Sequence, residues 1–203
     1  MVSASVWLSL MVFPKIIFFI SISIWLFTPF RQYKNRYFLY FLILAILDPL
    51  VLIIQLFGSI QPSRIYLIGV LFQIISLLNF RKTINYKIIL LLIIITNIWF
   101  SFNFGILAIN LCLILENLIV LTIFLKISIL NTYENMQINS FYVVIIFYLI
   151  SIITKFLVGI TDLKFGVPYF YLTSAFEIII GIFFIFFNDK NSPRLNWFFN
   201  KDI

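Results

Sequence analysis

Long apolar stretches separated by short polar breaks dominate this sequence. A stretch of about 20 residues is long enough to cross a hydrocarbon core of about 30 Å as an α-helix. The pattern predicts about seven such helices, over residues 10–30, 37–57, 64–80, 85–101, 106–127, 141–161 and 167–187. Because a helix satisfies its own backbone hydrogen bonds within lipid, we expect an all-α, polytopic transmembrane bundle.

Composition narrows the possible functions. Hydrophobic residues make up 64% of the 203 residues and charged residues 10%, which is far from the balance of a soluble domain. The chain has no histidine and a single cysteine, Cys112, so a histidine metal site, a Ser/His/Asp triad and an internal disulfide are excluded. It also lacks a Gly-rich phosphate loop and a nucleophile elbow. We therefore expect no catalytic residues, no cofactor and no metal.

The basic residues predict how the helices are oriented. One set of surfaces would carry Arg31, Lys34, Arg36, Arg81, Lys82, Lys87, Lys126, Lys190, Arg194 and Lys201, and the other set only Arg64 and Lys164. The positive-inside rule then places the N-terminus outside and the C-terminus in the cytoplasm, as an odd number of helices requires. We expect a multi-pass protein of the cell (inner) membrane, with a transmembrane domain over residues 1–187 and a short cytoplasmic tail over 188–203. The basic residues behind the net charge of +7 then serve to orient the helices in the lipid bilayer. We therefore expect no nucleic-acid partner.

A faint internal repeat relates the two halves of the chain. Asn35 matches Asn139 and residues 72–75 match 176–179 at an offset of 104, and Pro62 matches Pro168 at an offset of 106. These matches pair the second and third helices with the sixth and seventh, which predicts two parallel triplets joined by one helix, a 3+1+3 arrangement. The alternative is a chance match in a sequence rich in Ile and Phe.

Three acids fall near the middle of predicted helices: Asp48, Glu116 and Glu177. Because a charge at the bilayer centre costs roughly 2.5–3.5 kcal/mol, we expect these acids to face the bundle interior, to be paired, or to be neutral. Lys155 shares one face of its helix with other polar and small residues, and Glu177 does the same on the next helix. The pattern predicts contact between Lys155 and Glu177, with Lys15 as a second cation for the remaining acids.

Polar side chains also align on the other helices. Asp48 shares a face with Gln55, Gln73 shares one with Ser76, and Asn117 lies about 100° from Glu116. We therefore expect a polar core that runs through five helices. Its candidate ligand- or proton-binding residues are Asp48, Gln73, Glu116, Lys155 and Glu177. The alternative role is structural, because polar contacts between membrane helices stabilise packing by about 0.6–2 kcal/mol each.

The outline of seven helices resembles several membrane families. It is similar to the rhodopsin-like receptors and, with the repeat, to the SWEET sugar transporters. Retinal proteins imply a Schiff-base lysine in the seventh helix, and residues 172–187 contain none. SWEET transporters imply prolines in the helices of both repeats, whereas the fifth and sixth helices here have none. The chain also resembles the small seven-helix sensory modules that act beside bacterial histidine kinases, and its Ile, Asn, Lys and Phe bias resembles AT-rich bacterial genomes.

Two functions fit these features. The first is a non-enzymatic sensory or scaffold module that detects a ligand, a proton or a membrane property and signals to a separate membrane or cytoplasmic protein partner. The second is a transporter of a small solute, driven by protonation of the mid-membrane carboxylates. Chemistry on a lipid by a pair of acids is a third possibility, but no motif in the sequence supports it.

Overall fold

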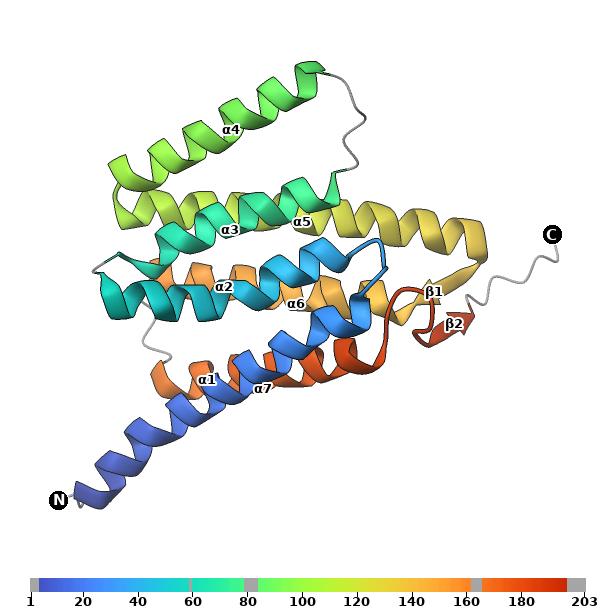
Figure 1. Ribbon diagram of the computed structural model, residues 1–203. Helices are drawn as coiled ribbons and strands as arrows, with labels where there is room; N and C mark the ends of the chain where they lie inside the picture. The colour runs from blue at the N-terminus through green and yellow to red at the C-terminus, as the bar shows by residue number, and fades with distance from the viewer. Residues whose placement is uncertain (1–3, 59, 79–83, 162–165, 197–203) are drawn as a thin grey trace.

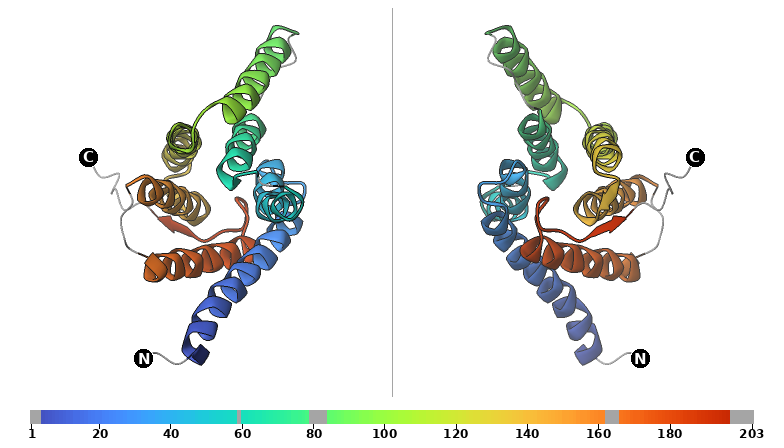
Figure 2. Two further views of the ribbon diagram at one scale, coloured as in Figure 1. Left: turned by 90° about the vertical axis from the view of Figure 1, so that its left-hand side faces the viewer. Right: turned by 90° about the vertical axis from the view of Figure 1, so that its right-hand side faces the viewer.

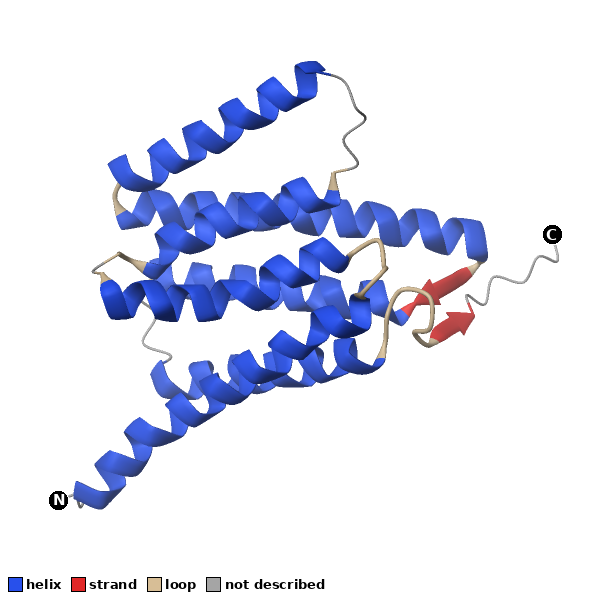
Figure 3. Cartoon of the chain, in the orientation of Figure 1, coloured by secondary structure: helices blue, strands red, loops and turns tan. Residues whose placement is uncertain are grey.

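The computed structural model of this chain describes residues 4–58, 60–78, 84–161 and 166–196 (Figure 1). These residues are almost entirely helical, and the remaining regular structure is two short strands (Figure 3). The elements are α1 (Ala4–Gln32), α2 (Phe38–Phe57), α3 (Pro62–Leu77), α4 (Ile84–Asn103), α5 (Ile106–Asn135), β1 (Gln137–Asn139), α6 (Ser140–Ile160), α7 (Gly166–Phe186) and β2 (Arg194–Asn196). The all-α prediction is confirmed, and each predicted helix corresponds to one described helix.

Within the described residues, three helices are long and apolar enough to cross a membrane: α2, α5 and α6. Shorter apolar segments lie in the other helices, over Ile16–Gln32, Pro62–Leu77, Leu91–Asn103 and Tyr171–Phe186. Large apolar side chains point outward from the fold, including Leu56 and Phe57, which are 81% and 88% exposed. An apolar exterior of this kind is suited to lipid rather than water.

Six of the helices form a closed ring. Each of α1, α2, α3, α5, α6 and α7 packs against the next in that order, and α7 packs back against α1. The two end-on views in Figure 2 show α1–α3 along one side and α5–α7 along the other. Helix α4 lies outside the ring and packs against α3.

The end of α5 differs from the prediction. We expected the fifth helix to end near residue 127, but α5 continues to Asn135 and ends at Met136, whose φ of 53° is left-handed. The helix contains neither Gly nor Pro that would stop it, and Asn135 Nδ2 donates to the Asn131 carbonyl oxygen at 2.9 Å within the same helix. Polar composition alone therefore did not end this helix.

A two-stranded antiparallel sheet ties the C-terminal segment to the α5–α6 junction. Gln137 pairs with Asn196, and Asn139 with Arg194. The buried side chain of Asn139 donates to the Asp189 carbonyl oxygen at 2.8 Å, and its Oδ1 accepts from Phe141 N at 2.9 Å and from Ser192 Oγ. The sheet was absent from our prediction for residues 188–203, and Trp197 and the residues after it lie outside the described part of the chain.

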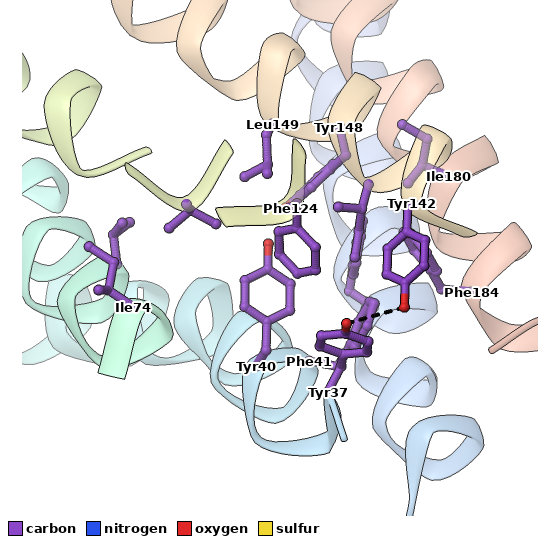
Figure 4. Close-up of a cluster of buried hydrophobic side chains, with 14 of the residues drawn as sticks. Tyr37, Tyr40, Phe41, Ile74, Phe124, Tyr142, Tyr148, Leu149, Ile180 and Phe184 are labelled. Atoms are coloured by element: carbon purple, nitrogen blue, oxygen red, sulfur yellow. Dashed lines mark hydrogen bonds between the residues drawn. The ribbon is translucent and has the colours of Figure 1, made fainter. Parts of the chain in front are cut away.

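A cluster of buried aromatic side chains packs between the helices of the ring (Figure 4). Its fully buried members come from the start of α2, from α5, from the start of α6 and from the end of α7: Tyr37, Tyr40, Phe41, Phe124, Phe141 and Phe184. Ring centroids lie 4.8 Å apart for Phe41 and Phe184, and 5.6 Å apart for Tyr37 and Phe141. Tilted and stacked contacts of this kind add to the stabilisation from burial. The cluster therefore joins α2, α5, α6 and α7 through buried ring contacts.

Candidate functional site

A cavity of about 280 Å³ lies inside the ring of helices. All six ring helices contribute to its lining, and the described side chains of α4 do not. The polar lining residues are Ser21, Asp48, Tyr66, Gln73, Asn117, Tyr148, Lys155, Ser174 and Glu177. Four of the five candidates from the sequence therefore line one cavity: Asp48, Gln73, Lys155 and Glu177.

Lys155 and Glu177 form an ion pair within this cavity. Lys155 Nζ donates to Glu177 Oε1, and the two side chains are 31% and 17% exposed. The predicted contact between α6 and α7 is confirmed. Both residues belong to polar stripes with helical spacing, and antiparallel packing brings the two stripes together.

Asp48 lies in the same cavity and is held by α3. Tyr66 Oη donates to Asp48 Oδ1 at 2.6 Å. The carboxylate is also close enough to Lys155 and to Glu177 for electrostatic interaction with both. Although Pro49 follows Asp48 and removes a backbone donor, α2 continues through it. Asp48 therefore joins α2 to α3 across the cavity rather than bonding within its own helix.

Gln73 and Asn117 complete the polar lining on α3 and α5. Gln73 is 3% exposed, and Asn117 Nδ2 donates to the Leu113 carbonyl oxygen of its own helix at 2.8 Å. Gln73 and Glu177 correspond at the repeat offset of 104, and both face the cavity.

Glu116 is outside the cavity. Asn97 Nδ2 on α4 donates to Glu116 Oε1 at 2.6 Å, so this acid joins α4 to α5. Glu116 Oε2 is buried and has no hydrogen-bond partner among the described residues. The adjacent Asn117 does face the cavity, and one helical step of about 100° explains why Glu116 points elsewhere. The side chain of Lys15, the second expected cation, lies outside the described part of the chain.

Sequence reasoning missed Tyr66 and Trp25. Tyr66 precedes Gln73 by seven residues, about two helical turns, so both lie on one face of α3. That spacing was a usable signal. Trp25 lines the cavity from α1 and packs on Tyr148 with ring centroids 4.8 Å apart. No charged residue on α1 marks this face within the described side chains.

Two glycines allow the helices around the cavity to approach closely. A Cβ at Gly69 would lie 2.1 Å from Leu47 Cδ2, at the α2–α3 contact that holds Asp48 beside Tyr66. A Cβ at Gly181 would lie 2.6 Å from Ile24 Cγ2, at the α1–α7 contact next to Trp25. Small residues at such positions are typical of helix interfaces in membranes.

Comparison with known proteins gives no relative: no family model matches the chain, and no curated protein or solved structure matches it significantly. The functional argument therefore depends on the chemistry of the cavity.

Proposed function

We propose that this chain is a multi-pass protein of the bacterial cell membrane that binds a small polar solute in the central cavity and carries it across the bilayer. All seven helices span the membrane in this proposal, with the N-terminus outside and the C-terminus in the cytoplasm. The protein is not an enzyme: its work is binding and conformational change. The main support is the central cavity, which all six helices of the ring line and to which they contribute both polar and apolar side chains.

The order of helices in the ring supports two parallel repeats. If α1, α2 and α3 correspond to α5, α6 and α7, the α3–α5 contact corresponds to the α7–α1 contact, and both are present. Helix α4 would then only link the triplets, which agrees with its position outside the ring (Figure 2). Tyr37 and Phe141 correspond at the offset of 104 and stack on each other, as equivalent residues near a pseudo-two-fold axis would. Transporters often place their substrate between such repeats.

Orientation gives the two ends of the cavity different roles. With the C-terminus in the cytoplasm, the aromatic cluster and the β1–β2 sheet belong to the cytoplasmic half. The cavity residues Lys155 and Glu177 then lie on the outer side of that cluster. Alternating access would require the aromatic cluster to open toward the cytoplasm, and rocking one triplet against the other would open it.

Flux measurements in liposomes test this proposal. Purified protein would be reconstituted, and uptake of labelled amines, amino acids, sugars and carboxylates would be compared with protein-free liposomes. We expect uptake of at least one class and its loss in Glu177→Gln. Glu116→Gln is the matched control, because Glu116 lies outside the cavity, and it should retain uptake. Equal uptake with and without protein for every class would contradict transport.

A sensory or scaffold function is the second candidate, and the β1–β2 sheet favours it. The sheet connects the segment after α7 to the junction of α5 and α6, so a helix movement around the cavity would shift it. Its strand β2 is exposed and available to a separate cytoplasmic partner. Ligand binding that protects this segment from proteolysis, together with an absence of flux, would support the sensor.

A further inference from the structure

We infer that the central cavity binds a small organic monocation, with the Asp48 carboxylate as its counter-ion and aromatic rings around its apolar part. This inference rests on the proposed function only in taking the cavity as a solute site. The evidence for it is the charges, hydrogen bonds and aromatic rings of the lining residues and the volume of the cavity.

The charges of the lining do not balance. Among the described residues, the cavity wall holds two carboxylates, Asp48 and Glu177, and one ammonium group, Lys155. Lys155 and Glu177 neutralise each other as an ion pair. Asp48 remains, and its hydrogen-bond donor is a neutral phenol, Tyr66. The described lining therefore holds one more carboxylate than it holds cations, and because an uncompensated charge in the membrane interior is costly, a cationic ligand would supply the missing positive charge.

Asp48 has room to accept a ligand hydrogen bond. Tyr66 uses Oδ1, and in the part of the chain that the structure describes no side chain donates to Oδ2. A carboxylate has lone pairs on both oxygens, and an ammonium group offers several N–H donors. Tyr66 thereby holds Asp48 in place while leaving an acceptor for the ligand.

Aromatic rings make up much of the remaining wall. Phe18, Trp25, Tyr66, Tyr148 and Phe156 all line the cavity. Ring faces attract organic cations, and they also pack against an apolar ligand body. An inorganic cation would instead favour a wall made mostly of oxygen ligands.

The volume sets the size of the ligand. A cavity of about 150 Å³ holds one benzene molecule, so a cavity of about 280 Å³ suits a ligand of roughly a dozen non-hydrogen atoms. Anions of that size would be repelled by Asp48 and Glu177. A zwitterion would have to displace Glu177 from Lys155, which would leave that carboxylate unpaired.

Calorimetric titration tests the sign of the ligand charge. The full chain in nanodiscs of zwitterionic lipid would be titrated with phenethylammonium, 2-phenylethanol and phenylacetate, which share an aromatic ring but differ in charge, with empty nanodiscs subtracted. We expect phenethylammonium to bind at least about tenfold more tightly than 2-phenylethanol. Phenylacetate should bind more weakly than either. Equal binding of amine and alcohol, or no amine binding at millimolar concentration, would overturn the inference.

Two variants test whether Asp48 causes the preference for the amine over the alcohol. Asp48→Asn should remove the preference for the amine over the alcohol, whereas Glu116→Gln should preserve it because Glu116 faces α4. An unchanged preference in a folded Asp48→Asn variant would overturn the assignment. Should that variant not fold, the three titrations of the natural chain still decide the sign of charge.

The outcomes also separate this inference from the transport proposal. Amine binding without flux of any solute class in liposomes would uphold the cation site and contradict transport. Flux of a neutral or anionic solute that persists in Asp48→Asn would uphold transport and contradict the cation site.

Discussion

Lys155 on α6 forms an ion pair with Glu177 on α7, and among the described residues this junction is the least closely packed between neighbouring helices of the ring. The other neighbours in the ring hold together through more extensive contact. The ion pair is therefore a principal connection between α6 and α7, at the wall of the cavity. Its removal should affect both stability and the shape of the site.

Removing one partner should destabilise the protein more than replacing both. We expect Lys155→Met to lower the free energy of unfolding by about 3 kcal/mol, because Glu177 is left as an unpaired charge. Lys155→Met combined with Glu177→Leu should recover most of that loss. Thermal denaturation in detergent of Lys155→Met, Glu177→Leu and the double variant gives the coupling free energy between the two residues. If the losses of the two single variants simply add in the double variant, the ion pair does not contribute to stability as described.

The faces of the helices were predictable, but their partners were only partly so. Helical spacing placed Lys155 and Glu177 on inward stripes, and sequential antiparallel helices leave few alternatives for their contact. The contact of Asp48 with Tyr66 depends on how α3 is rotated against α2, which spacing within one helix does not determine. Glu116 shows the same limit, because its partner is on α4 outside the ring.

The sheet illustrates a different limit. Strands β1 and β2 have three residues each and are separated by α6 and α7. Three residues are too few for an alternating pattern to be recognised. What holds them together is the network around Asn139, which forms only after the chain has returned to the same end of the bundle.

Gly181 should tolerate no larger side chain, unlike Gly159. Alanine at 181 would place its Cβ 2.6 Å from Ile24 Cγ2, so α1 and α7 would have to separate, and we expect a loss of about 1–3 kcal/mol. Gly159→Ala is the control, because nothing lies within 4 Å of a Cβ there. Alanine also favours the helix by about 1 kcal/mol over glycine. Equal melting temperatures for the two variants would show that the α1–α7 contact is looser than described.

Asn139→Ala should release the segment after α7. The substitution removes the N-cap of α6 and the bonds to Asp189 and Ser192, and loss of an N-cap alone costs about 1 kcal/mol. Limited proteolysis should then cut residues 188–196 faster than in the natural chain. Asn135→Ala is the control, because Asn135 is exposed and bonds only within α5 among the described residues. Similar cleavage of both variants would contradict this role of Asn139.

Arg64 on α3 should hold the end of α4 against the ring. Arg64 Nη1 donates to the carbonyl oxygens of Ser101 and Phe102, at 2.8 and 3.0 Å, and a cation at a helix C-terminus is favourable. Arg64→Met removes these bonds and keeps an apolar stem, and hydrogen bonds to charged groups are worth about 1.5–3 kcal/mol. Hydrogen exchange of residues 98–105 should therefore become faster.

Arg31→Met provides the reciprocal control for this exchange experiment. Arg31 Nε donates to the Phe186 carbonyl oxygen at 3.2 Å, at the C-terminus of α7. We expect that variant to accelerate exchange over residues 183–188 and to leave 98–105 unchanged, whereas Arg64→Met should do the opposite. Accelerated exchange in both regions with either variant would mean that the whole fold has loosened, and unchanged exchange in Arg64→Met would mean that α4 is held by its apolar contact with α3 alone.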